Sequence, residues 1–255
     1  MSVVPKRELG QHFLVDENIL GVIRRLAELA TRDVVLEIGA GLGVLTTYLA
    51  DRVRLVHAVE VDRSLEPQLR ARLAGRPNVK LVFGDALALR LHELDPPPGK
   101  LVANLPYQVA TPVVAETLAG LPTVDLWCVM VQREVADRFF ARPGTRSYGA
   151  VSVLIQLTAE RTGFHPVGRS VFRPPPNVDS ALVAFRRTRD WGSEFEPIKR
   201  AVQAAFAHRR KTLGNSLVLS GFPRDRVERA LGERAGLRAE ALAPAEFVDL
   251  ARALA

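Results

Sequence analysis

Cysteine is almost absent from this 255-residue chain, which contains only Cys128. A single cysteine excludes a disulfide within a monomer, and its apolar neighbours indicate a buried core thiol. The five histidines lack the spacing of metal ligands, so we expect no bound metal. No apolar run approaches the ~20 residues that a bilayer-spanning helix needs, and no signal-peptide pattern opens the chain. We therefore expect a cytoplasmic protein without a membrane segment, and we expect it to be a monomer.

Positive charge is what the chain has in excess. Lys and Arg number 35 against 28 Asp and Glu, which gives a net charge of +7 and a pI near 10.1. Residues 186–255 hold 14 basic and 9 acidic residues, so +5 of the +7 lies in this segment. This surplus favours a polyanionic partner, although a basic pI also fits many proteins without one.

Short apolar runs alternate with helical patterns up to about residue 140. Asp16 is a candidate N-cap for the first helix. Alternation with short connections predicts a doubly wound, mostly parallel α/β sheet. The expected strands lie near 33–38, 54–59, 79–83, 100–104 and 125–131, and the expected helices near 44–51, 62–74, 109–119 and 132–141.

The pattern changes after residue 145. We expect a helix over 148–159, a strand over 161–167, a rigid proline-rich loop over 172–180 and a closing, antiparallel strand over 181–187. Beyond Trp191 only helical spacing remains, in 198–207, 224–231 and 244–254. The sequence thus predicts an α/β domain over residues 1–188 and a small all-helical domain over residues 189–255.

A glycine-rich turn follows the first strand of the α/β region, with Gly39, Gly41 and Gly43 before a helix. This arrangement lets the backbone approach a nucleotide-like ligand closely. The third glycine comes too early for a dinucleotide fingerprint, and the acidic Glu37 before the turn would repel a pyrophosphate. A cationic cofactor without phosphates tolerates that carboxylate, and S-adenosylmethionine fits this description.

Polar residues end four successive strands: Glu37, Glu60, Asp85 and Asn104. In open α/β sheets the ligand crevice lies outside the carboxyl ends of the strands, so these side chains are expected to meet. Glu60 would accept hydrogen bonds from ribose hydroxyls and Asp85 from the adenine amine. Each acid alone is more often a solvated residue at a strand end.

Asn104 opens the tetrad Asn104-Leu105-Pro106-Tyr107, which suits methylation of an exocyclic amine on a base. The lone pair of such an amine is delocalised into the ring. The Asn104 side-chain carbonyl and the Pro106 backbone carbonyl can accept its hydrogens and draw the nitrogen toward a tetrahedral geometry. Tyr107 offers a face on which an extruded base can stack. The alternative is simply a strand followed by a proline turn.

Two further features have structural and functional interpretations. Phe172, before the proline-rich loop, either covers the edge of the core or forms a second aromatic face opposite Tyr107. Arg209, Arg210 and Lys211 follow an apolar helical face; they are either a solvated helix end or contacts to an RNA backbone. We expect no dedicated general base, since the product ammonium is acidic enough to lose its proton to water.

Six motifs together resemble the small-subunit ribosomal RNA adenine dimethyltransferases of the KsgA type, in that family's order and spacing. The match spans residue 6 to about 218. The motifs are Gln11-His12-Phe13-Leu14, Glu37-Ile38-Gly39-Ala40-Gly41-Leu42-Gly43, Gly84-Asp85-Ala86-Leu87, Asn104-Leu105-Pro106-Tyr107, the stretch 172–181 and the stretch 205–213.

The resemblance implies a Rossmann-like methyltransferase that dimethylates two adjacent adenines in the terminal hairpin loop of small-subunit rRNA. It also implies action on a partly assembled subunit, late in assembly. The family's base-handling residues correspond to Asn104, Pro106, Tyr107 and Phe172. Its cofactor contacts correspond to His12, Leu14, Gly39, Glu60, Asp85 and Asn104, and we add Gly41 from the glycine turn.

Two departures and two alternatives stay open. His12 stands where Asn is frequent in the family. Ala103 stands where Gly often precedes the tetrad, and this second departure leaves open whether the product is mono- or dimethylated. One alternative is an Erm-type large-subunit rRNA methyltransferase that confers macrolide resistance and shares the glycine turn and the tetrad. The other is an RNA-binding assembly or transcription factor that has kept the fold and lost catalysis.

Overall fold

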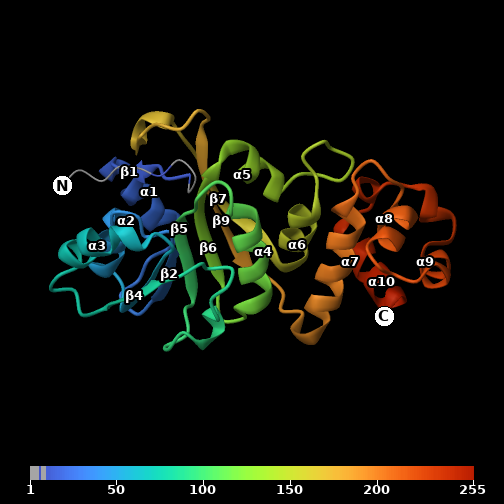
Figure 1. The fold of residues 1–255 in the computed structure, drawn as a ribbon, viewed down its shortest axis with the longest axis horizontal. Helices are drawn as coiled ribbons and strands as arrows, with labels where there is room; N and C mark the ends of the chain where they lie inside the picture. Colours follow the sequence, from blue (N-terminus) through green and yellow to red (C-terminus); the bar gives the residue numbers. More distant parts are fainter. Residues whose placement is uncertain (1–5, 7–9) are drawn as a thin grey trace. The chain divides into compact units, whose positions relative to one another are not determined.

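A computed structural model describes residue 6 and residues 10–255 of the chain. Its internal contacts form two compact units (Figure 1), and each is described by itself. The first unit combines Met1–Ala136 with Arg161–Arg187, and the second combines Asp137–Glu160 with Thr188–Ala255. The assignment of separate roles to residues 1–188 and 189–255 stays a prediction. Among the described residues, no helix is long and apolar enough to cross a membrane.

A seven-stranded sheet organises the first unit, in the order β4-β3-β2-β5-β6-β9-β7. The five strands from β4 to β6 are mutually parallel, and β9 joins β6 in antiparallel orientation. The predicted doubly wound sheet and its antiparallel closing strand are confirmed. The strands are β2 (Val34–Ile38), β3 (Leu55–Glu60), β4 (Val79–Phe83), β5 (Lys100–Asn104), β6 (Leu126–Gln132), β7 (Ala159–Val167) and β9 (Ser180–Arg187).

Helices cover both faces of this sheet because the central strands bury side chains on both sides. Figure 1 shows α1, α2 and α3 on one side and α4 on the other. Asp16 caps α1 as expected, its carboxylate accepting a hydrogen bond from Asn18 N–H at 2.7 Å. These helices are α1 (Glu17–Leu26), α2 (Val44–Ala50), α3 (Glu66–Arg72) and α4 (Ala110–Gly120). Helix α5 (Arg133–Phe139) follows β6 and contains the division between the units.

Aromatic packing joins β6 to the antiparallel strand β9. Trp127 on β6 stands opposite Phe185 on β9, and their rings stack with centroids 5.3 Å apart. The indole N–H of Trp127 donates to the Thr117 hydroxyl of α4 at 3.1 Å, so this polar group is satisfied although the residue is fully buried. Cys128, the next residue along β6, is buried as predicted, and burial raises the pKa of its thiol to about 12.

The second unit is a bundle of short helices. Tyr148 lies at its centre: its hydroxyl donates to Leu242 O at 3.0 Å, and its ring meets Phe206 edge-on. Phe206 in turn packs against Phe247. The helices are α6 (Ala150–Thr158), α7 (Phe195–Ala207), α8 (Leu213–Leu219), α9 (Arg224–Leu231) and α10 (Pro244–Leu254).

Three elements differ from the sequence-based expectation. Helix α8 was not expected, and it begins at a Thr212 cap whose hydroxyl accepts from Asn215 N–H at 3.4 Å. Strands β1 (Phe13–Leu14) and β8 (Phe172–Arg173) form a separate antiparallel pair, within segments expected to be irregular or loop. This pairing joins residues about 160 positions apart, and no local pattern announces it.

Candidate functional site

A cavity of about 260 Å³ opens at the carboxyl ends of the parallel strands in the first unit. It lies where α/β sheets bind their ligands. All seven cofactor candidates from the sequence line it, together with three of the four catalytic candidates. They are His12, Leu14, Gly39, Gly41, Glu60, Asp85, Asn104, Pro106 and Tyr107, with Asn104 in both groups. Phe172 does not line the cavity.

The glycine turn between β2 and α2 requires its glycines. Gly39, Gly41 and Gly43 have φ angles of +82°, +57° and +74°, a region that side chains with a Cβ rarely adopt. A Cβ on Gly39 would lie 3.2 Å from the Pro106 ring, and one on Gly41 would lie 3.2 Å from the Phe13 ring. The missing side chains therefore create room where the turn meets two other walls of the cavity.

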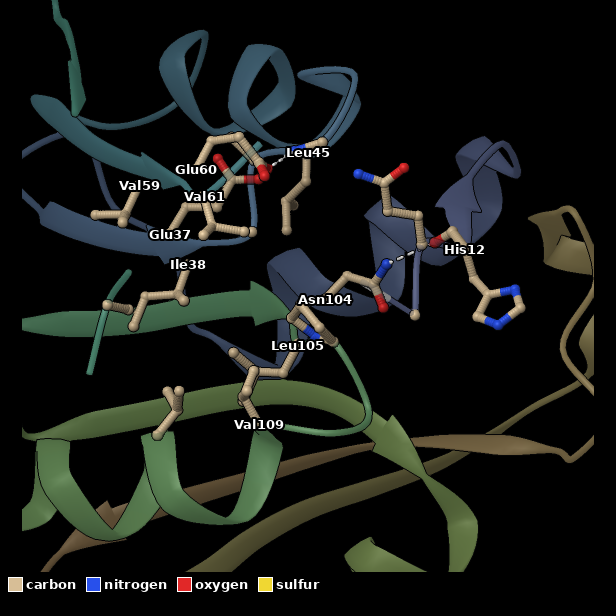
Figure 2. Close-up of a pocket in the computed structure, with 18 of the residues that line it drawn as sticks. His12, Glu37, Ile38, Leu45, Val59, Glu60, Val61, Asn104, Leu105 and Val109 are labelled. Carbon is tan, nitrogen blue, oxygen red and sulfur yellow. Dashed lines mark hydrogen bonds between the residues drawn. The ribbon is translucent and has the colours of Figure 1, made fainter. Parts of the chain in front are cut away.

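Glu60 at the end of β3 holds this turn. Its Oε2 accepts from Gly41 N–H at 2.7 Å (Figure 2), and its Oε1 accepts from Asp62 N–H at 2.8 Å. The residue is only 5% exposed, and two charge-assisted hydrogen bonds offset the cost of burying the carboxylate. Each oxygen keeps acceptor capacity, so Glu60 can still receive a hydroxyl from a ligand.

Glu37, at the end of the neighbouring strand β2, has the opposite environment. It is 1% exposed, and its Oε2 has no hydrogen-bond partner among the described residues. Burial raises the pKa of Glu37 to about 8; Thr46 offsets this only in part, and the charge of Glu60 adds to it. Figure 2 shows the two carboxylates close together on one wall of the cavity. This wall favours a ligand with positive charge.

Asp85 follows β4, lines the cavity and is exposed. Its Oδ1 accepts from Leu87 N–H at 2.9 Å, a local turn that a solvated strand-end aspartate also makes. Its other carboxylate oxygen has no partner among the described residues. The structure thus places Asp85 at the cavity and leaves its ligand role a prediction.

Asn104 is oriented by the N-terminal segment. Its Nδ2 donates to His12 O at 3.2 Å, so the amide nitrogen is turned toward the N-terminal segment (Figure 2). This hydrogen bond assigns the two ends of the amide. The side-chain oxygen, Oδ1, has no partner in the described part of the chain, so it is open to accept from an amine.

His12 and Tyr107 form the next part of the rim. Their ring centroids lie 5.5 Å apart with the planes tilted by 30°. The Nδ1 of His12 donates to Pro174 O at 2.8 Å, and Figure 2 shows its ring pointing away from Glu37 and Glu60. His12 therefore contributes its backbone to the Asn104 contact, while its ring is bound to the proline-rich loop.

Tyr107 is held by Ser180, the first residue of β9. Their hydroxyls share a hydrogen bond of 2.6 Å, and Ser180 is 1% exposed. Partial burial raises the pKa of the Tyr107 hydroxyl, and the bond to Ser180 offsets this in part. The ring is thus fixed from its hydroxyl end, and it lines the cavity. The sequence offered Ser180 only as part of a motif, without this contact.

Of the two interpretations of Phe172, core side chain or second stacking face, its position in the structure fits the first. Its position on β8, paired with Leu14 of β1, leaves it 2% exposed within the hydrophobic core. Its ring offers no face to the cavity in this conformation. A base-stacking role stays a prediction that requires the 172–180 loop to move.

The three predicted RNA-binding cations lie in the second unit. All are exposed and follow the last residue of α7, Ala207, so they lie in the turn before α8 rather than along a helix face. Arg209 donates to Arg146 O at 2.9 Å. Arg210 and Lys211 form no ion pair with any described residue.

Residues that the motifs did not single out also line the cavity. Val61 is the most unusual, because it is an apolar side chain that is 50% exposed directly after Glu60. Its exposure is a signal that only the structure provides. For metals, the described residues contain no group of three or more His, Cys, Asp or Glu side chains that could hold an ion.

Comparison with known proteins decides the family. Residues 4–255 match the ribosomal RNA adenine dimethylase family. The chain belongs to this family. A ribosomal RNA small subunit methyltransferase A from Rubrobacter xylanophilus is 47% identical over 97% of this chain and 94% of its own length. The protein of the same name from Moorella thermoacetica is 42% identical over 99% and 93%. The resemblance noted in the sequence is therefore confirmed, and the protein is an enzyme.

Two solved structures share the fold. A dimethyladenosine transferase from Plasmodium falciparum superposes with a TM-score of 0.73 at 24% identity, covering 94% of this chain and 96% of that one. The 23S rRNA methyltransferase ErmE superposes with a TM-score of 0.63 at 32% identity, covering 95% and 99%. The adenine dimethylase fold thus extends over both units of the chain.

Family and fold imply S-adenosylmethionine as the cofactor, and the cavity fits it on two observations. The first is the glycine cradle, which a Cβ at Gly39 or Gly41 would fill. The second is the unpartnered Oε2 of Glu37, a buried acceptor beside the cavity that suits a cationic ligand. Glu60 and Asp85 would hold the ribose and adenine ends.

We predict that Glu60→Gln weakens S-adenosylmethionine binding at least ~10-fold, since losing a hydrogen bond to a charged group costs about 1.5–3 kcal/mol. The substituted amide would also turn an N–H toward either Gly41 N–H or Asp62 N–H. Titration calorimetry measures the affinity. Glu66→Gln, which breaks the exposed pair with Arg70, is the control. Equal affinities for Glu60→Gln and wild type would reject the assignment.

We predict that Glu37→Gln raises the melting temperature of the cofactor-free protein more at pH 8 than at pH 5. Because the folded-state pKa of Glu37 is about 8, the folded protein retains a proton that the unfolded chain releases above its ordinary value of 4.5. Stability due to Glu37 therefore falls as pH rises from 4.5 to 8. At pH 8, the gain in melting temperature of the variant over wild type should exceed its gain at pH 5 by more than about 2 °C. Equal gains at both pH values would show that Glu37 does not titrate in this way.

Proposed function

We propose that this protein transfers methyl groups from S-adenosylmethionine to the exocyclic amines of two adjacent adenines in the 3′-terminal hairpin loop of small-subunit rRNA. The substrate is an immature ribosomal subunit, and the reaction belongs to late assembly in the cytoplasm, with the protein acting as a monomer. The observation that carries the proposal is the orientation of Asn104. Its amide nitrogen is bound to His12 O, and its oxygen is open at the cavity.

The tetrad residues would make different contacts with the base. Asn104 Oδ1 and the Pro106 carbonyl accept the two amine hydrogens and localise the nitrogen lone pair for attack. The Tyr107 ring, anchored through Ser180, supports the adenine by stacking. The cofactor supplies an electrophilic methyl group on a sulfonium when bound. The amine loses its proton to water, so no side chain is assigned as a base.

Selection of the small subunit is supported by the relatives named ribosomal RNA small subunit methyltransferase A, at 42–47% identity. The ErmE structure, at 32% identity, keeps the large subunit as a second candidate. Radiolabelled methyl transfer to immature small subunits, followed by primer extension on both rRNAs, tests the proposal. Reverse-transcription stops at two adjacent small-subunit adenines are expected. Stops only in large-subunit rRNA would favour the second candidate, and absence of transfer would favour a binding factor.

We predict that Asn104→Ala lowers the single-turnover rate of methyl transfer at least ~100-fold, a loss typical of removing one polar group that acts on the transition state. Cofactor affinity should change far less, because the hydrogen bond to His12 O is a single weak contact. Rapid-quench transfer and calorimetry measure the two effects. Asn18→Ala, an exposed amide on α1, is the control. A variant with near-normal transfer would remove Asn104 from the chemistry.

We also predict that replacing Arg209, Arg210 and Lys211 together with Ala weakens binding to the small subunit and flattens its dependence on salt. Cations that contact phosphates release counterions, so their loss lowers the slope of log affinity against log salt. Filter binding over a salt series measures this slope. The control replaces Arg224 and Arg229 of α9, which pair with Glu228 and Asp225.

Calorimetry on the same triple variant should show unchanged affinity for S-adenosylmethionine, because the cavity is built from the first unit. A salt slope equal to that of wild type would return the three cations to the structural interpretation, a solvated end of α7.

A further inference from the structure

A buried carboxylate outside the cavity joins the N-terminal segment to the end of β3. Asp62 is 4% exposed and accepts hydrogen bonds from Lys6 Nζ at 2.8 Å and Gln11 Nε2 at 2.9 Å. Ser64 adds its backbone N–H at 3.0 Å and its hydroxyl at 2.6 Å. Four donors thus converge on one carboxylate, two of them from a segment about 50 residues away in sequence.

Lys6 and Gln11 also bind each other. The backbone N–H of Lys6 donates to Gln11 Oε1 at 2.8 Å, and the backbone N–H of Gln11 donates to Lys6 O at 3.4 Å. Both side chains are therefore presented to Asp62 by a closed local geometry, which lowers the entropy lost in forming the contact. We call Lys6, Gln11 and Asp62 the anchor cluster.

The anchor cluster differs from an ordinary surface ion pair. Exposed pairs contribute little because solvent screens them and both side chains are mobile. Here the side chain of Asp62 is 2% exposed, while that of Lys6 is 40% exposed. Burial alone raises the pKa of the Asp62 carboxyl, but the hydrogen bonds from Lys6, Ser64 and Gln11 outweigh burial and leave that pKa well below its usual range.

The segment that the cluster holds is a wall of the cofactor cavity. Residues 10–14, which we call the strap, all line it. At its far end, the strap pairs through Phe13 and Leu14 with β8. Between these two attachments, His12 O receives the amide of Asn104. The strap is thus fixed at both ends and contacts the base-handling residue in the middle.

Asp62 connects this wall to the one that contains Glu60. Its side chain binds the strap, and its backbone N–H donates to Glu60 Oε1 at 2.8 Å. The same Glu60 holds Gly41 in the glycine turn. Asp62 therefore joins the strap to Glu60, the candidate ribose acceptor, and Glu60 joins both to the glycine turn.

We propose that Asp62 is a positioning residue that keeps the strap closed along the cofactor cavity, so that the anchor cluster controls the rate at which cofactor is exchanged. The inference rests on the proposed function in taking S-adenosylmethionine as the ligand. Asp62 itself contacts no reacting atom. Its effect passes through Lys6 and Gln11 to the strap, and it requires that the strap move before the cofactor leaves.

The test separates strap closure from folding by changing the strap side of the cluster. Lys6→Gln removes the charge from a half-exposed side chain, so the variant folds. Its dissociation rate for S-adenosylmethionine, measured by stopped-flow displacement, should rise at least ~5-fold. Hydrogen exchange at the amides of residues 11–14 should accelerate in the cofactor-free protein, while exchange in the central strands β2, β5 and β6 should stay at the wild-type rate. Asp62→Asn should produce the same two changes, and combining both substitutions should add little.

Two control variants make the outcome specific. Ser64→Ala removes one donor to Asp62 without touching the strap, and Arg70→Gln breaks an exposed ion pair in the same unit. Both should keep the wild-type dissociation rate. The proposal would be overturned if Lys6→Gln left both the cofactor dissociation rate and hydrogen exchange in the strap unchanged. It would also be overturned if Ser64→Ala released cofactor as fast as Lys6→Gln does, because Asp62 would then have a purely local role.

Failure of the proposed function would look different. A wild-type protein that binds no S-adenosylmethionine in calorimetry would overturn the ligand assignment and, with it, control of cofactor exchange. The hydrogen-exchange comparison uses the cofactor-free protein, so it would still decide whether the anchor cluster holds the strap.

Discussion

Two backbone N–H groups share the carboxylate of Glu60, and the rest of the site depends on this arrangement. One comes from Gly41, whose positive φ opens the glycine turn, and the other from Asp62, whose side chain holds Lys6 and Gln11. A buried carboxylate is tolerated because both donors are fixed by the backbone and need no further ordering. Two acidic side chains, Glu60 and Asp62, thus link the end of β3 to the glycine turn and to the N-terminal segment.

Glu37 is a buried carboxylate whose hydrogen bonds offset its burial only in part. It stands on the strand beside that of Glu60, in a parallel register that pairs Glu37 with Ala58, and it is as deeply buried. Burial raises its pKa to about 8, and hydrogen bonds from Thr46 offset this only in part. A cationic ligand beside Glu37 would favour the ionised form of this carboxyl. Binding of such a ligand would be linked to release of a proton near neutral pH.

The parallel sheet explains why much of the site was predictable from sequence. Parallel strands bring their carboxyl ends to one edge, so Glu37, Glu60, Asp85 and Asn104 had to meet once the strands were recognised. Contacts between distant segments lacked any such rule. The burial of Phe172 follows from pairing with Leu14, and the role of Ser180 follows from a side-chain contact with Tyr107. The sequence did not predict helix α8, because Gly214, Asn215 and Ser216 are weak helix formers. The Thr212 cap and tertiary packing decide its structure.

The two halves of the site are prepared to different degrees. On the cofactor side, hydrogen bonds within the protein join the glycine turn to Glu60, Glu60 to Asp62, and Asp62 to the strap. On the base side, Tyr107 is fixed through Ser180, but Phe172 is buried and Asn104 Oδ1 has no described partner. In the proposed reaction, a flipped adenine would meet the ring of Tyr107, Asn104 Oδ1 and the Pro106 carbonyl, which also accepts from Val109 N–H at 3.1 Å. A second stacking face from Phe172 would require movement of the 172–180 loop, because that side chain is 2% exposed.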